Sequence, residues 1–216
     1  MRTLEEIVRL LTNPGVIAVV RARSEEQVLP LAEALVEGGV IAIEITLTTP
    51  NALHAIEKAA ARFGQRALIG VGTVLNAEVC RAAISTGAEF VVSPITKPEI
   101  ADASHESSKP VMLGAYTPTE AQAAYEAGAD FIKLFPADGL GPAYVKALRA
   151  PLPHLRIVPT GGVDLSTAAA FIEAGCVALG AGSSLLKPKI LEENNWPELT
   201  RLAEAFVEVV RKARGK

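Results

Sequence analysis

Short apolar runs rich in Val and Ile alternate along the chain with longer, Ala-rich segments whose apolar positions recur at helical spacing. Runs of roughly four to eight apolar residues bounded by Gly, Pro, Asn or Asp are typical of buried strands, and the longer periodic segments are typical of helices. Eight strand-like runs occur in order: VIAVV, VIAIEI, ALIGV, FVVSP, VMLGA, FIKLF, RIVPT and VALGA. Because helices separate them, the pattern predicts a parallel α/β sheet, and eight such units close a (β/α)8 TIM barrel. An open, doubly wound sheet is the alternative architecture.

A repeated helix-to-strand turn supports this count. The segments VEGGVIAIEI, STGAEFVVS, EAGADFIKLF and EAGCVALG carry Gly39, Gly87, Gly128 and Gly175, which are 48, 41 and 47 residues apart. Each step corresponds to two strand–helix units, so these glycines precede the second, fourth, sixth and eighth strands. We expect each glycine to cap its helix in the left-handed conformation.

The two ends of the chain complete the pattern. The start, MRTLEEIVRLLTNPG, predicts a short amphipathic N-terminal helix, and a last helix near residues 196–213 precedes the basic tail RKARGK, which we expect to fray in solvent. The 216 residues lie near the lower limit for an eight-stranded barrel, and no linker or low-complexity stretch interrupts them. We therefore predict a single barrel domain over residues 1–216.

Composition disfavours several classes of function. A net charge of -3 and a pI near 5.7 provide no basic field for nucleic acid or anionic membranes, and no apolar run approaches the roughly 20 residues of a membrane helix. Cys80 and Cys176 are far apart, which disfavours a disulfide framework, and His54, His105 and His154 lie in separate segments. We expect a cytoplasmic protein with no metal site and no nucleic-acid or membrane partner.

Lys133 interrupts an apolar strand-like run at a position that faces the barrel interior. In the run FIKLF, period-two alternation places Lys133 on the same face as Phe131 and Phe135, while Ile132 and Leu134 face the helices. Burial of an amine favours its neutral form, which is the form that attacks a carbonyl carbon. Lys133 is therefore a candidate Schiff-base lysine. The alternative is that it lies at the strand end and extends its amine to water.

Glu44 occupies an equivalent position in the second run. Alternation places it on the interior face with Ala42 and Thr46. The second and sixth strands lie opposite each other in an eight-stranded ring, so Glu44 and Lys133 would face each other across the barrel mouth. A carboxylate beside an imine-forming lysine suits a general base, and a structural ion pair is the alternative.

Glycine-rich segments follow the seventh and eighth runs, PTGG at 159–162 and GAGSS at 180–184. Loops after these two strands form the usual phosphate site of TIM barrels, because glycine lets backbone N–H groups approach an anion and a short helix presents its positive end. The segments predict a phosphate site, although glycine-rich loops also occur as simple turns.

The runs EGGVIAIEIT, GVGTVLN, FVVSP, FIKLFPA and PTGGV, in this order and spacing, closely resemble the 2-keto-3-deoxy-6-phosphogluconate (KDPG) aldolase family, also called 4-hydroxy-2-oxoglutarate (KHG) aldolase. The resemblance covers residues 5–212, and KLFP and PTGG are quite specific to the family. It implies a class I aldolase that cleaves KDPG reversibly to pyruvate and glyceraldehyde 3-phosphate, with cleavage of KHG to pyruvate and glyoxylate as a second activity. It also implies a cytoplasmic homotrimer that needs no metal or organic cofactor.

The same resemblance implies roles for individual residues. Lys133 would form the Schiff base, and Glu44 would shuttle protons. The residues that would surround the pyruvate moiety are Thr73, Pro94, Phe135 and Thr160, and those that would bind the phosphate are Gly161, Gly162, Gly182 and Ser183.

One position departs from the family pattern. Family members commonly carry an arginine two residues after the glutamate–threonine pair, and this chain has Thr48 there. We expect Arg21, at the end of the first run, to bind the substrate carboxylate instead, because a guanidinium offers a carboxylate two parallel N–H donors. The alternative is an exposed Arg21 that pairs with Glu25 or Glu26.

The sequence leaves other functions open. An aldolase of the same family could act on the galactonate epimer of KDPG, since the two substrates differ at one carbon. A phosphosugar isomerase, a thiamine phosphate synthase-like barrel or a non-catalytic phosphosugar-binding barrel would share the glycine loops. None of these three needs an imine-forming lysine at position 133.

Overall fold

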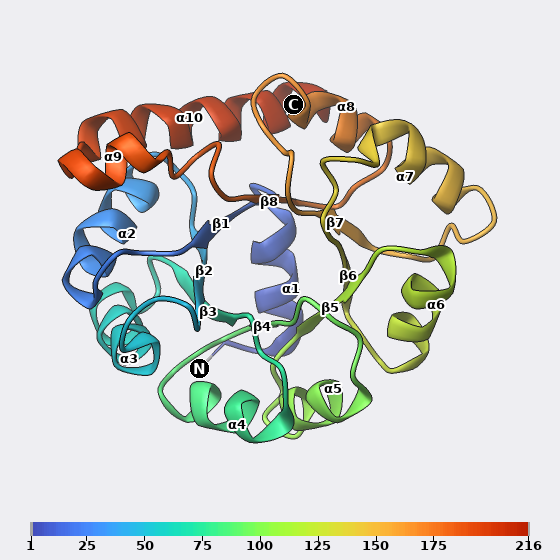
Figure 1. Cartoon of the computed structure of the whole chain (residues 1–216), viewed down its shortest axis with the longest axis horizontal. Coiled ribbons are helices and arrows are strands. Elements are labelled where there is room, and N and C mark those ends of the chain that lie inside the picture. Colours follow the sequence, from blue (N-terminus) through green and yellow to red (C-terminus); the bar gives the residue numbers. More distant parts are fainter. Residues whose placement is uncertain (1, 216) are drawn as a thin grey trace.

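The computed structural model describes residues 2–215 and shows a ring of parallel strands surrounded by helices (Figure 1). The strands are β1 (Val16–Val20), β2 (Ala42–Thr46), β3 (Leu68–Gly72), β4 (Val91–Val92), β5 (Val111–Ala115), β6 (Phe131–Leu134), β7 (Ile157–Pro159) and β8 (Leu179–Ala181). Their order is β7-β6-β5-β4-β3-β2-β1-β8, and a parallel bridge between Thr160 and Gly180 joins the two ends of this order. The sheet is therefore closed, which confirms the predicted barrel and excludes the open, doubly wound sheet.

The helices cover the outside of the ring. They are α2 (Val28–Glu37), α3 (Ala52–Phe63), α4 (Ala77–Ser85), α5 (Pro98–His105), α6 (Pro118–Glu126), α7 (Gly141–Arg149), α8 (Ala168–Glu173), α9 (Pro188–Glu193) and α10 (Trp196–Ala213), with a short 3-10 turn η1 (Glu25–Gln27) before α2. The long α10 packs against α2 and α8 (Figure 1). In the part of the chain that is described, no helix is long and apolar enough to cross a membrane.

The N-terminal helix α1 (Leu4–Thr12) closes one end of the barrel, as its position across the ring in Figure 1 shows. Its buried Ile7 and Leu11 pack into a cluster with strand residues that include Leu68, Phe90 and Phe131. Burying these side chains away from water stabilises the closed end. Access to the barrel interior is therefore at the opposite end, where the strands finish and the loops that follow them begin.

The four repeated glycines have the predicted conformation. The φ angles of Gly39, Gly87, Gly128 and Gly175 are +83°, +107°, +89° and +98°. These values lie in the region that L-residues rarely adopt, so the missing side chain is what allows each helix to turn into β2, β4, β6 or β8.

The basic tail does not fray at Arg214, contrary to expectation. The Arg214 guanidinium is partly buried and donates hydrogen bonds to the carbonyls of Thr12, Pro14 and Val177 at 2.7–3.3 Å. It thereby links the end of α10 to the turns that lead into β1 and β8. Burial lowers the pKa of this guanidinium without removing its charge at neutral pH. Met1 and Lys216 lie outside the described residues.

Candidate active site

Lys133 and Glu44 meet inside the barrel, as their strand positions predict. Lys133 on β6 is 6% exposed, Glu44 on β2 is 2% exposed, and their Nζ and Oε1 atoms are 3.5 Å apart. The alternative in which Lys133 extends its amine to water is wrong, because the side chain is directed inward and shielded. Its Nζ also lies 5.4 Å from the centre of the Phe135 ring, close enough for an attractive contact when the amine is charged.

The carboxylate of Glu44 is buried without full hydrogen bonding. Its Oε1 has no hydrogen-bond partner among the described residues, since the contact with Lys133 is an ion pair without hydrogen-bond geometry. A buried carboxylate oxygen normally accepts hydrogen bonds, and leaving it without a donor is unfavourable. Glu44 Oε1 is therefore able to accept a proton or a hydrogen bond from a bound molecule.

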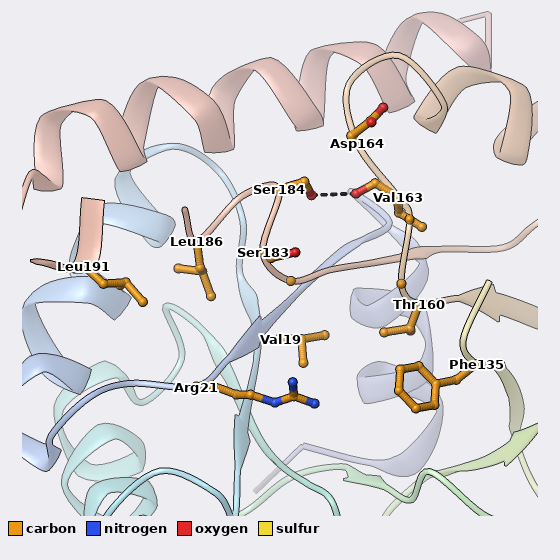
Figure 2. Close-up of a pocket in the computed structure, with 13 residues that line it drawn as sticks. Val19, Arg21, Phe135, Thr160, Val163, Asp164, Ser183, Ser184, Leu186 and Leu191 are labelled. Atoms are coloured by element: carbon orange, nitrogen blue, oxygen red, sulfur yellow. Dashed lines mark hydrogen bonds between the residues drawn. The ribbon is translucent and has the colours of Figure 1, made fainter. Parts of the chain in front are cut away.

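A cavity of about 420 Å³ opens at the C-terminal end of the barrel (Figure 2). Its lining contains Phe135 and Thr160, which immediately follow β6 and β7, and all four of the predicted phosphate-binding residues. Those four are Gly161, Gly162, Gly182 and Ser183. Lys133 and Glu44 lie outside this lining. The amine and its carboxylate thus lie beside the cavity, next to the Phe135 side of its wall.

The glycine loops have free donors. The backbone N–H groups of Gly161, Gly162, Gly182 and Ser183 donate no hydrogen bond within residues 2–215. Unpaired backbone N–H groups that line a cavity are suited to an anion. Gly161 and Gly162 have φ angles of +88° and +67°, so a glycine is also required there by the backbone.

Asp164 closes the turn between the first glycine loop and α8 (Ala168–Glu173). The Oδ1 atom of Asp164 accepts hydrogen bonds from the N–H groups of Ser166 and Thr167 and from the Ser166 hydroxyl. The Ser166 hydroxyl, and then these N–H groups, hold the pKa of Asp164 below its usual range. The N–H groups of Ser166 and Thr167, in the turn before α8, are therefore not available to an anion, because a carboxylate already accepts hydrogen bonds from them. The glycine N–H groups remain as the donors of this wall.

Arg21 immediately follows β1 and lines the cavity. Figure 2 shows its guanidinium extending past Val19 toward Phe135. It forms no hydrogen bond or ion pair with another residue of the described chain. Glu25 pairs instead with His54 and Lys58. Arg21 is exposed, as the alternative expected, but the expected ion pair with Glu25 or Glu26 is wrong, and the guanidinium is available to a ligand.

Thr73 and Pro94 lie at the same end of the barrel but outside the cavity lining. Thr73 directly follows β3 and has a φ of +65°, a strained conformation for a β-branched residue. Pro94 follows β4 and packs against Gly114 of β5. Thr48, where the family commonly has arginine, is exposed and shares a hydrogen bond with the Thr46 hydroxyl at 2.8 Å.

A sequence profile described as KDPG and KHG aldolase matches residues 7–202. The chain belongs to this aldolase family. The 2-dehydro-3-deoxy-phosphogluconate aldolase of Haemophilus influenzae is 31% identical over 97% of this chain and 99% of that protein. The 2-dehydro-3-deoxy-6-phosphogalactonate aldolase of Escherichia coli K12 is 35% identical over 93% of this chain and 98% of that protein.

A solved structure of the family gives the same result. KDPG aldolase from Legionella pneumophila, with pyruvate captured at low pH as a covalent carbinolamine intermediate, has a TM-score of 0.82 and 30% identity, covering 92% of this chain and 97% of that chain. The present chain is therefore an aldolase, a lyase that cleaves carbon–carbon bonds. This excludes the non-catalytic barrel and disfavours the isomerase and thiamine phosphate synthase-like alternatives.

Several cavity residues of this aldolase were missed by sequence reasoning. Asp164 follows the first predicted glycine loop, and the aspartate after PTGGV is a signal for it; Ser184, which also lines the cavity, lies within the predicted segment GAGSS. Leu186 and Leu191 form an apolar wall of the cavity (Figure 2). Nothing in the sequence distinguishes these leucines from those of the core. They face the cavity because of the direction that the chain takes after β8.

Residues 2–215 contain no candidate metal site. That part of the chain holds no group of three or more His, Cys, Asp or Glu side chains arranged to bind a metal ion. The histidines pair locally, for example His54 of α3 with Glu25 and His105 of α5 with Asp130.

Proposed function

We propose that this aldolase uses Lys133 to form an imine with the C2 ketone of KDPG and releases pyruvate and glyceraldehyde 3-phosphate. The observation that carries the proposal is the 3.5 Å contact between the buried amine of Lys133 and the buried carboxylate of Glu44. A structural ion pair would be expected to satisfy both groups, whereas Glu44 Oε1 has no hydrogen-bond partner in the described chain. A carbinolamine, as captured with pyruvate in the Legionella relative, is the adduct of an amine and a ketone.

The chain's own groups suffice for each step. Lys133 Nζ attacks C2, and loss of water gives the iminium, which withdraws electrons from the neighbouring bonds. Glu44 accepts the proton of the C4 hydroxyl, so the C3–C4 bond breaks, its electron pair forms the enamine, and glyceraldehyde 3-phosphate leaves. Glu44 then returns the proton to C3, and water hydrolyses the resulting imine to pyruvate and the free amine. One carboxylate serves as base and then as acid, which conserves the proton.

The cavity suits the rest of the substrate. A volume of about 420 Å³ is in the range of pockets for small organic ligands. We infer that Arg21 binds the carboxylate, that Phe135 and Thr160, with Thr73 and Pro94 at the rim, enclose the pyruvate moiety, and that Gly161, Gly162, Gly182 and Ser183 bind the phosphate. Four free N–H donors and a cavity at the ends of β7 and β8 support the phosphate assignment.

The galactonate epimer of KDPG is a second candidate substrate. The E. coli relative named for this epimer is 35% identical to the chain, and the H. influenzae relative named for phosphogluconate is 31% identical. The family resemblance further supports a homotrimer. Neither inference changes the roles proposed for Lys133 and Glu44, because the epimers differ only in the configuration at C4.

Steady-state kinetics on KDPG, its galactonate epimer, KHG and the dephosphorylated ketoacid test this proposal. We expect kcat/KM to be at least about 100-fold higher with phosphate than without it, because two or more charge-assisted hydrogen bonds contribute about 1.5–3 kcal/mol each. Equal efficiency on the phosphorylated and dephosphorylated ketoacids would contradict the phosphate site. No cleavage of any of the four would contradict the proposed reaction.

Gly182→Val is the cleanest variant for the phosphate site. A Cβ at Gly182 meets nothing within 4 Å, so a side chain there would enter the cavity without disturbing the fold. Gly162→Val is less informative, because Gly162 has a φ of +67° and its Cβ would contact Asp138. We expect Gly182→Val to abolish the preference for phosphate. The matched control is Gly139→Val, where a Cβ also has space, and it should keep that preference.

A further inference from the structure

Three glycines on the strands face residues of the predicted active site that lie on the neighbouring strand or shortly after it. In each pair, a Cβ added to the glycine would overlap the partner residue. The pairs are Gly72 with Glu44, Gly114 with Pro94, and Gly180 with Thr160. None of these glycines has a left-handed φ, so the backbone does not require glycine at any of them. In each pair, the neighbouring residue occupies the volume that a side chain at the glycine position would fill.

Gly72 and Glu44 form the pair closest to the proposed chemistry. Gly72 ends β3 and pairs in register with Thr46 of β2, while Glu44 lies two residues before Thr46. A Cβ on Gly72 would lie 2.6 Å from both Cγ and Cδ of Glu44, and closer still to Oε1. These distances are shorter than the contacts that Cβ atoms make in proteins. An alanine at position 72 is therefore incompatible with the present conformation of Glu44.

We propose that Gly72 is a positioning residue, whose missing side chain lets the Glu44 carboxylate lie against β3 within reach of Lys133. The inference rests on the proposed role of Glu44 as the proton carrier. A Cβ at position 72 would overlap Glu44 only at side-chain atoms beyond its Cβ, so a change of side-chain torsion can move the carboxylate away while the strand keeps its place. A carboxylate displaced by about 1 Å from a reacting group can lose about 10²-fold in rate.

Gly70 provides a matched comparison on the same strand and the same face. A Cβ there would overlap the ring of Phe90, which is fully buried in the closed half of the barrel. A buried ring has little room to move, so Gly70→Ala should reduce thermal stability through overpacking. It should leave the Glu44 carboxylate where it is.

The test is Gly72→Ala in the full chain, with exchange of solvent deuterium into the methyl group of pyruvate as the readout. We expect exchange to fall at least about tenfold, while borohydride trapping of pyruvate is retained and the melting temperature changes less than in Gly70→Ala. In a Glu44→Ala background the same glycine substitution should cause no further fall, because the side chain that it displaces has been removed. A purely structural effect of Gly72 would persist in that background.

The outcomes separate this inference from the proposed function. If Glu44→Gln exchanges deuterium at the parent rate, the proposed role of Glu44 is wrong, and the inference about Gly72 fails with it. If Glu44→Gln slows exchange but Gly72→Ala stays within about twofold of the parent, only the positioning role is overturned. An equal loss in folded Gly70→Ala, or a loss that persists in Glu44→Ala, also overturns it.

Discussion

At the scale of single residues, we propose that Arg21 takes over a role that the family pattern assigns to the position of Thr48. With Thr48 in place of the common arginine, the carboxylate of a bound ketoacid needs a different cation, since burying an unpaired carboxylate costs several kcal/mol. Arg21 lines the cavity and has no ion-pair partner within residues 2–215. A guanidinium in this position can bind a carboxylate with two parallel hydrogen bonds.

We therefore expect Arg21→Ala to weaken pyruvate and ketoacid binding by about 2–5 kcal/mol, or at least about 30-fold. Arg21→Lys should also bind poorly, because an ammonium cannot reproduce the two parallel donors. Steady-state kinetics and the pyruvate concentration dependence of borohydride trapping measure the effect. A control is Arg23→Ala, since Arg23 forms an exposed ion pair with Glu192. KM and kcat within about threefold of the parent for Arg21→Ala would mean that another group binds the carboxylate.

At the scale of the elements, both ends of the described chain, residues 2–215, contact the closed end of the barrel. Helix α1 fills that end with Ile7 and Leu11, and Arg214 after α10 donates to three carbonyls in the turns before β1 and β8. Each carbonyl would lose a donor if Arg214 were removed, and buried carbonyls without donors are unfavourable. The tail therefore contributes to the stability of the barrel.

Arg214→Ala should lower the free energy of unfolding by about 1–3 kcal/mol, because it leaves these carbonyls without a protein donor. Urea denaturation of the parent and the variant measures this difference. Arg201→Ala is the matched control, since Arg201 pairs with Glu198 on the exposed face of α10 and its loss should have no measurable effect. An Arg214→Ala variant as stable as the Arg201→Ala variant would show that the tail has no structural role.

The regular elements were predictable because each depends on local sequence. Alternation in FIKLF and VIAIEI gave the inward faces of β6 and β2, and the repeated glycines gave the turns into four strands. The contacts of Arg214 were not predictable, because they join residues 37, 200 and 202 positions apart in the sequence. The apolar cavity wall of Leu186 and Leu191 was also not predictable, since leucines in a folded protein normally indicate core.

At the scale of the whole molecule, barrel closure brings distant residues into one site. Glu44 and Lys133 lie on opposite strands of the ring, and neither strand alone has a catalytic arrangement. Their contact was predicted from the number of strands, because eight strands place the second opposite the sixth. Two features could not be predicted from the sequence: the cavity lies beside Lys133 and Glu44 and not directly over them, and Gly72 leaves space for Glu44. Both depend on how side chains pack across the closed ring.

The central claim is that Lys133 is the imine-forming residue, and trapping of pyruvate with borohydride tests it most directly. The parent protein, incubated with pyruvate and reduced, should gain the mass of one reduced pyruvate adduct, and peptide mapping should locate it at Lys133. Lys133→Ala should gain no such mass and should lose cleavage activity, because the other lysines lie elsewhere, with Lys97 before α5 and Lys109 before β5. An adduct that maps to Lys97, Lys109 or any other lysine, or that persists in Lys133→Ala, would contradict the account.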